Sequence, residues 1–129
     1  MDLAISDAAS RAGVSIHTLH YYEREGLLRV ARTESGHRRY SSGDLEWIGI
    51  LTCLRETGMP LRTMREFAAL VQQNSSNIPE RVRILEAHRL EVLEHMKSIQ
   101  HNLEHVEGKI GHYKGVLAQA DKQEPQGVD

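Results

Sequence analysis

A long apolar repeat in the second half of the chain constrains its fold more than any other feature. Between positions 82 and 120, mainly apolar residues recur in alternating steps of three and four, which is the heptad spacing of a coiled coil. This heptad seam, with Arg89 as its one polar interruption, consists of Val82, Leu85, Arg89, Val92, Met96, Ile99, Leu103, Val106, Ile110, Tyr113, Leu117 and Ala120. A single helix over residues 79–120 would be about 63 Å long, too long to pack on a small domain. The seam therefore predicts a partner chain.

The other residues are enough for one modest domain. The chain has 129 residues and an aromatic content of 5%, which limits the size of a compact core. We expect a compact domain over residues 1–73, a polar linker over 74–78, a dimerisation helix over 79–120 and a disordered tail over 121–129. The predicted fold class is mainly α.

A helix-turn-helix is predicted near the start. Asp2 to Ala12 is expected to be a helix capped by Ser6 or Asp7, and Gly13 is a stop signal. Ser15 is then expected to cap a second helix, after a turn of only two residues. In that helix the spacing directs Leu19 to the core. It leaves an outward set of His17, Thr18, His20, Tyr21 and Arg24, although the pattern does not decide whether Tyr21 or Tyr22 is buried.

A hairpin and two further helices are expected to follow. Residues 27–30 read as a brief strand, residues 33–36 as a turn and residues 37–40 as a second arm, which together make a winged helix. Ser41 or Ser42, with Asp44, is expected to cap a third helix that ends at Glu56. A fourth helix is expected to begin near Pro60, which suits a first-turn position.

An arginine cluster points to nucleic acid more clearly than the net charge does. Residues 1–65 carry nine basic and eight acidic side chains, too even a balance to indicate DNA binding alone. However, Arg29, Arg32, Arg38 and Arg39 fall within eleven positions. The planar guanidinium group can donate two parallel hydrogen bonds to phosphate or guanine.

Several other classes of protein are disfavoured. The single cysteine, Cys53, excludes an internal disulfide framework and a cysteine-built zinc site. No paired carboxylates, nucleophile with a histidine motif or phosphate loop occur at a usable spacing, so we expect neither an enzyme nor a cofactor. The sequence lacks a membrane-spanning run and the pattern of a signal peptide, so we expect a cytoplasmic protein without a membrane partner.

The run GVSIHTLHYYEREGLL, the loop SGHRRY, the segment DLEWIGILTCLRETGMPL and the terminal heptad helix together resemble the MerR family of bacterial transcription regulators. The resemblance covers about Leu3 to Leu117. It implies a homodimer held by an antiparallel coiled coil and bound to double-stranded DNA at a pseudo-palindromic promoter spacer. It also implies activation by bending and untwisting that spacer, so that RNA polymerase is reached indirectly through the promoter.

The resemblance carries roles to individual residues. Ser15, His17, Thr18, His20, Tyr21 and Arg24 match recognition-helix positions, and His37, Arg38, Arg39 and Tyr40 match the first wing. Arg62 matches a phosphate contact of the second wing. His20 departs from the family pattern, since many members carry arginine there, and this leaves a base contact and a phosphate contact both open.

Cys53 is the candidate sensing residue, because it matches the lone thiol of the branch that responds to aldehydes and other thiol-reactive electrophiles. A lone cysteine in a helix is more often a small buried apolar residue. The alternatives are therefore a MerR-like regulator with another inducer and a structural Cys53, or an architectural DNA-bending protein. His88, His95, His101, His105 and His112 are spread over several heptad positions, which favours a solvated helix surface over a metal site.

Overall fold

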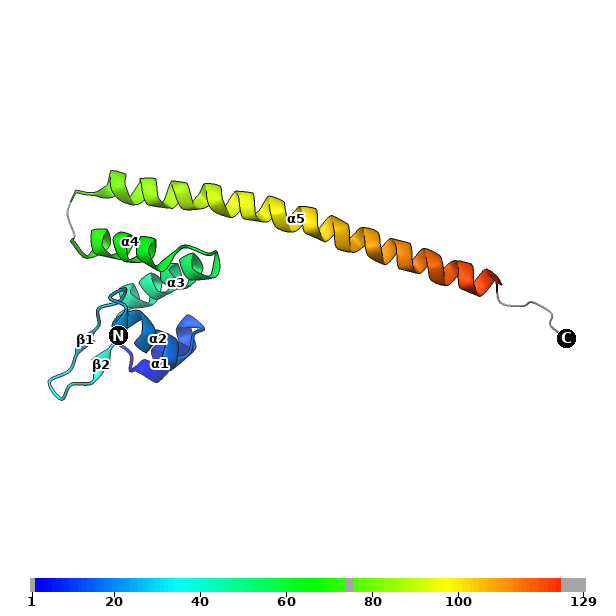
Figure 1. Ribbon diagram of the computed structural model, residues 1–129. Helices are drawn as coiled ribbons and strands as arrows, with labels where there is room; N and C mark the ends of the chain where they lie inside the picture. The colour runs from blue at the N-terminus through cyan, green and yellow to red at the C-terminus, as the bar shows by residue number, and fades with distance from the viewer. Residues whose placement is uncertain (1, 74–75, 124–129) are drawn as a thin grey trace. The chain divides into compact units, whose positions relative to one another are not determined.

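A computed structural model describes residues 2–73 and 76–123, with side chains as far as Lys122. The elements within these ranges are α1 (Ile5–Ala12), α2 (Ile16–Arg24), β1 (Ala31–Arg32), β2 (Arg38–Arg39), α3 (Ser42–Glu56), α4 (Leu61–Gln73) and α5 (Ile78–Gln123). Residues up to Arg89 form one compact unit, called here the proximal unit, and the rest of α5, Leu90–Gln123, forms a second, called the distal helix. The predicted order of a helical domain, a small hairpin and a long terminal helix is confirmed (Figure 1).

The core of the proximal unit contains side chains from all four helices α1, α2, α3 and α4. Leu19 and Tyr22 of α2 are fully buried with Ile48 and Leu51 of α3 and Ala68 of α4. Trp47 stacks on Phe67, with ring centroids 5.8 Å apart, and so joins α3 to α4. Burying each large apolar side chain contributes about 1.5–3 kcal/mol, so this core fixes the position of α2.

The start of α3 is set by a capping box. The Ser41 hydroxyl accepts a hydrogen bond from the Asp44 N–H at 3.0 Å, and the Asp44 carboxylate accepts one from the Ser41 N–H at 2.9 Å. Two of the free donors at the helix start are thus satisfied. The predicted cap is confirmed, with Ser41 rather than Ser42 at the cap position.

Three local predictions in the first forty residues were wrong. The first helix starts at Ile5 instead of Asp2, because Leu3 pairs with Tyr40 as an isolated bridge, with both N···O distances 2.8 Å. Its cap residue is Ala4, which makes no side-chain cap bond, so neither Ser6 nor Asp7 caps it.

Residues 27–30 do not form the expected strand. The Leu27 N–H donates to the Tyr22 carbonyl, and the Leu27 carbonyl accepts a hydrogen bond from Trp47 Nε1 at 2.8 Å. With both groups used, Leu27 cannot pair with the second arm of the hairpin. The strand begins at Ala31.

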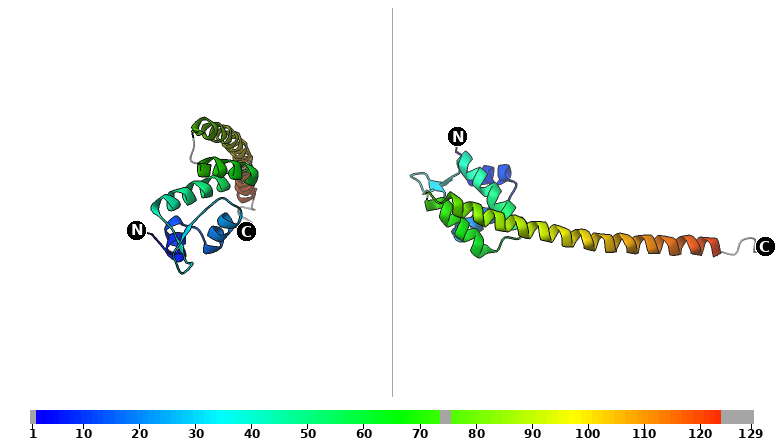
Figure 2. Two further views of the ribbon diagram at one scale, coloured as in Figure 1. Left: turned by 90° about the vertical axis from the view of Figure 1, so that its left-hand side faces the viewer. Right: turned by 90° about the horizontal axis from the view of Figure 1, so that it is seen from above.

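The hairpin is short and projects from the edge of the helices, as Figure 1 and the right-hand view of Figure 2 show. Strands β1 and β2 are antiparallel, with Ala31 opposite Arg39 and Arg32 opposite Arg38. The turn between them contains Gly36 at a φ of 87°, in the left-handed region that favours glycine. The predicted turn is confirmed.

Helix α5 begins one residue before Pro79, at Ile78, and continues through Asp121, Lys122 and Gln123, where a disordered tail was predicted. Asn77 joins its start to α4, since its Nδ2 donates to the Leu70 carbonyl at 2.9 Å. The linker residues Asn74 and Ser75 and the tail residues 124–129 lie outside the described residues.

Candidate nucleic-acid interface

The turn between α1 and α2 depends on one glycine and one serine. Gly13 ends α1 with a φ of 71°, where a side chain would be strained. Ser15 Oγ then accepts a hydrogen bond from the Thr18 N–H at 3.0 Å and lies 3.0 Å from the Thr18 hydroxyl. The predicted tight turn and cap are confirmed. The Ser15 side chain consequently has a structural role, besides any contact with DNA.

Helix α2 presents one buried and one open face. Tyr22 is the buried tyrosine, and its hydroxyl is 3.0 Å from the Thr52 hydroxyl of α3. On the outer side, His17 and Arg24 are exposed, while Thr18 and His20 are half-buried. The outward set predicted from spacing thus lies on one side of the helix, opposite Leu19.

Tyr21 is half-buried and lies between two arginines. The guanidinium carbon of Arg24 is 5.7 Å from its ring centroid, and that of Arg55, from α3, is 5.1 Å away. Both are cation–π distances. Arg55 was not among the predicted site residues, because no spacing rule places an α3 side chain beside α2.

The arginines of the wing are arranged around a carboxylate. Arg38 Nε donates to Glu23 Oε1 at 2.6 Å, and Arg32 Nη2 donates to Glu23 Oε2 at 3.1 Å. Arg32 Nη1 also donates to the Gly36 carbonyl at 3.0 Å. Arg38 is therefore half-buried instead of lying at a solvated hairpin tip. Glu23 and Arg32 thus lie with Arg38 in the candidate interface. Sequence placed Arg32 in the arginine cluster without giving it a role, and it did not single out Glu23.

Two other predicted wing residues are open to solvent. Arg39 is exposed, and so is His37, whose Nδ1 lies 3.3 Å from the Ser35 hydroxyl. The His37 N–H donates to the Thr33 hydroxyl at 3.1 Å, which closes the turn. These side chains are available at the surface of the hairpin.

Tyr40 is a core residue. Its side chain is fully buried, and its hydroxyl has no hydrogen-bond partner among the described residues. Burial, together with the nearby Glu23 carboxylate, raises the pKa of the Tyr40 phenol. A fully buried ring cannot contact DNA, so the predicted contact of the Tyr40 side chain is incompatible with this structure. The prediction rested on the family pattern of a tyrosine after two arginines, which does not show which way the ring points.

Arg62 is exposed in the first turn of α4, where the resemblance placed a phosphate contact of the second wing. One turn later, Arg65 forms an ion pair with Glu25 and donates to its carbonyl at 3.3 Å. This pair connects α4 to the end of α2. Among the predicted DNA-contacting residues, Arg62 lies farthest towards the C-terminus in sequence.

A hollow of about 370 Å³ lies where α2 meets the wing. Its lining residues are His20, Glu23, Arg24 and Arg38. Three of these carry or can carry a positive charge beside one carboxylate. Such a concave, arginine-bordered edge can accept a phosphate or a base edge.

Cys53 lies on another face, on α3, and its side chain is exposed. Its carbonyl accepts a hydrogen bond from the Thr57 hydroxyl at 2.7 Å. The same hydroxyl lies 2.7 Å from His88 Nε2 on α5. In the single chain, Cys53 is thus not the small buried residue that one alternative assumed.

Among the described residues, no group of three or more histidine, cysteine, aspartate or glutamate side chains could hold a metal ion. The rings of His101 and His105 lie 5.1 Å apart, but they provide only two donors. The same part of the chain contains no helix that is long and apolar enough to cross a membrane.

Two short helices joined by a tight turn, with an arginine-bearing hairpin beside the second helix, define a winged helix-turn-helix protein. The family described as MerR HTH family regulatory protein matches residues 3–71. The chain belongs to this family of DNA-binding transcriptional regulators.

The relatives support this assignment. The chain is 34% identical over 119 residues to an uncharacterized HTH-type transcriptional regulator of Haemophilus influenzae, covering 92% of this chain and 88% of that protein. It is 33% identical over 91 residues to the HTH-type transcriptional regulator AdhR of Bacillus subtilis, covering 70% of this chain and 65% of AdhR. These relatives are regulators, in agreement with the expectation that the chain is not an enzyme.

Two solved structures are similar in fold. One is HiNmlR, a MerR family regulator lacking the sensor domain and bound to promoter DNA, with a TM-score of 0.84, 34% identity and coverage of 92% of this chain and 94% of that one. The other is a MerR family transcriptional regulator from Listeria monocytogenes, with a TM-score of 0.85, 30% identity and coverage of 94% and 92%.

Proposed function

We propose that two copies of this chain bind one promoter spacer through their winged helices and activate transcription by distorting the DNA between them. Each copy contributes the outward side of α2, the wing arginines and Arg62. A regulator of this kind reaches RNA polymerase only through the shape of the promoter. The similarity to HiNmlR, whose structure contains promoter DNA, supports the choice of partner.

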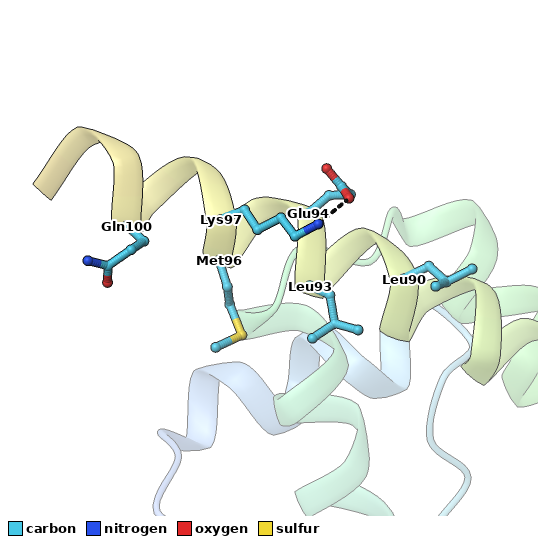
Figure 3. Close-up of a pocket in the computed structure, with 6 residues that line it drawn as sticks. All are labelled: Leu90, Leu93, Glu94, Met96, Lys97 and Gln100. Carbon is cyan, nitrogen blue, oxygen red and sulfur yellow. Dashed lines mark ion pairs between the residues drawn. The ribbon is translucent and has the colours of Figure 1, made fainter. Parts of the chain in front are cut away.

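The observation that carries the proposal is the apolar surface of the distal helix. Val92 is half-buried, and the other large apolar side chains of this helix are 45–65% exposed, from Leu103 at the lower end to Leu117 at the upper. Figure 3 shows Leu93 and Met96 pointing to one side of the helix, while Lys97 turns towards Glu94, its ion-pair partner at 3.5 Å. A stripe of this extent in water is typical of an unpaired coiled-coil helix. A second copy in antiparallel orientation would cover it.

The proposed signal is a reactive aldehyde, such as formaldehyde or methylglyoxal, that adds to Cys53. The thiolate attacks the carbonyl carbon and its electron pair forms the new S–C bond. The C=O π pair moves to oxygen, which takes a proton from water and gives a hemithioacetal. The exposure of Cys53 supports the access that this reaction needs.

The contact of Cys53 with its surroundings supports a route for the signal. Its carbonyl, the Thr57 hydroxyl and His88 form a chain of hydrogen bonds from the last turn of α3 to α5. A bulkier side chain at Cys53 would crowd this turn and shift α3 against α5. Because α5 also carries the dimer seam, the shift would change the placement of the two winged helices on the duplex.

A footprint and a promoter reporter test the proposal, each with wild type and Cys53→Ser, with and without aldehyde. We expect both proteins to protect the same DNA, and only the wild type to gain reporter output and a changed cleavage pattern between the two half-sites. The serine variant keeps the size of the side chain but is a much poorer nucleophile. A full aldehyde response of Cys53→Ser would disprove sensing at this residue, and the absence of any footprint would disprove the wider proposal.

A further inference from the structure

Glu23 is the acidic residue in a surface that otherwise gathers positive charge. Its carboxylate pairs with Arg32 at 3.1 Å and Arg38 at 2.6 Å, one from each strand of the wing. A carboxylate beside a phosphate-binding surface opposes binding through repulsion. Its presence in the hollow between α2 and the wing therefore needs another explanation.

The pairing is not an ordinary exposed ion pair. The side chains of Glu23 and Arg38 are only 25% and 28% exposed, and the bond between them is charge-assisted. Arg32 extends the contact to the hairpin turn, through its bond to the Gly36 carbonyl. One carboxylate from α2 thus connects the helix to both strands and, through Arg32, to the turn.

The bond to Glu23 uses Arg38 Nε and leaves the two terminal nitrogens of the guanidinium group available. A guanidinium group has five N–H donors in one plane, and Glu23 takes the Nε donor. The two terminal nitrogens keep their donors, on the part of the plane farthest from the backbone. Fixing the plane through Nε reduces the rotamer entropy that Arg38 would lose when it binds a phosphate.

We propose that Glu23 is a positioning residue for DNA binding: it orients Arg38, with Arg32, so that the terminal nitrogens of Arg38 meet the DNA backbone. This rests on the proposed use of the wing as a DNA contact. It differs from a simple charge effect in sign, since loss of a negative charge near DNA would by itself strengthen binding.

The test uses a duplex selected by the wild-type protein from a random-sequence pool. Glu23→Gln keeps the shape of the side chain and removes its charge. We expect it to bind the selected duplex roughly tenfold more weakly, because the orienting contact is lost. We also expect its plot of log affinity against log salt concentration to flatten by about one, as the Arg38 phosphate contact is lost.

Two further variants separate positioning from charge and from folding. Glu34→Gln removes a negative charge from the same hairpin, at an exposed position in the turn, and is expected to bind as well as wild type or better. In the Arg38→Ala background, Glu23→Gln is expected to weaken binding less than about twofold further. Thermal melts of each variant show whether the protein is folded under the binding conditions.

Tighter binding by Glu23→Gln, an unchanged or steeper salt dependence, or a full additional loss in the Arg38→Ala background would each overturn the inference. These outcomes leave the proposed function intact, because wild type still binds the duplex. Failure of the wild type to select any duplex would instead disprove the proposed function, and this inference with it.

Discussion

The proximal unit and the distal helix differ in the exposure of their large apolar side chains: most are buried or half-buried in helices α1 to α4, and most are exposed on the distal helix. In the proximal unit, Leu19, Ile48 and Leu51 are fully buried against neighbouring elements. In the distal helix, Ile99 and Leu103 are 53% and 45% exposed, as one helix offers them no neighbour. Helices α1 to α4 of the first unit share a core within one chain, whereas most seam residues of α5, including Val82 and Leu85 in the first unit, remain exposed.

This difference assigns separate physical tasks to the two regions. A buried core gives α2 and the wing one fixed arrangement, which contact with DNA requires. An exposed stripe gains free energy only when another surface covers it, so its stabilisation depends on protein concentration. The proposed regulator thus has rigid DNA-contacting parts and a spacing between them that a dimer interface sets.

Replacing both Ile99 and Leu103 by aspartate should have the largest effect. Four charges would enter the seam of a dimer, and we expect its dissociation constant to rise by at least about a thousandfold. Sedimentation equilibrium measures this constant. Ser98→Asp with His101→Asp adds the same charges at outer heptad positions and should leave the dimer intact. A seam variant that stays as dimeric as the control would contradict the proposed interface.

Leu51→Ala should act in the opposite region. Its side chain is fully buried, so the substitution should lower the free energy of unfolding by about 2–5 kcal/mol. We expect the dimer dissociation constant to change less than about threefold, because the seam is untouched. Leu103→Ala is the matched variant, and it should weaken the dimer instead. If both substitutions had the same effect on dimerisation, the division between the two regions would be wrong.

Arg38→Ala should weaken binding to the selected duplex by roughly tenfold and flatten its salt dependence by about one counterion. Titrations at several salt concentrations measure both quantities. Arg83→Ala, on the exposed surface of α5, removes an equal charge outside the candidate interface and should change neither by as much. An unchanged slope for Arg38→Ala would remove Arg38 from the phosphate contacts.

Two tyrosine substitutions should have the smallest effects, and of different size. Tyr22→Phe removes a hydroxyl that bonds Thr52 and should cost about 1 kcal/mol. Tyr40→Phe removes a buried hydroxyl without a partner among the described residues, and should be neutral or slightly stabilising. Chemical denaturation at neutral pH compares them. Equal costs would mean that the Tyr40 hydroxyl is also bonded in solution.

The Tyr22→Phe and Tyr40→Phe variants should also differ in how their folding stability depends on pH. Burial raises the pKa of Tyr40 in the folded chain. Above about pH 10, the unfolded chain loses this proton first, so folding stability should fall as the pH rises towards the folded-state pKa. Below that range the stability is fully present. Tyr40→Phe should reduce the alkaline loss, and Tyr22→Phe should keep the part due to Tyr40.

Sequence predicted those features whose signals are local. Gly13, the Ser15 cap, the turn ending at Gly36 and the Ser41–Asp44 box each depend on residues within a few positions of one another. Local backbone chemistry decides such features, and sequence spacing displays it. The heptad seam is similarly visible because a helix repeats its faces at a fixed period.

Sequence missed the features that depend on tertiary packing. Glu23 and Arg38 are fifteen residues apart, and Thr57 and His88 thirty-one. No periodicity connects such pairs. The resemblance placed Tyr40 among the DNA contacts of the first wing, but its backbone pairs with Leu3 and its ring lies in the core. Long-range hydrogen bonds thus decided the details of the candidate interface.

The number of chains bound to one selected duplex tests the central claim most directly. Native mass spectrometry of the purified complex gives this number, and hydroxyl-radical cleavage of the same sample locates the contacts. We predict two chains per duplex and two protected segments related by an approximate twofold axis. One chain per duplex with a single protected segment would contradict the claim that the distal helix places two winged helices on one promoter.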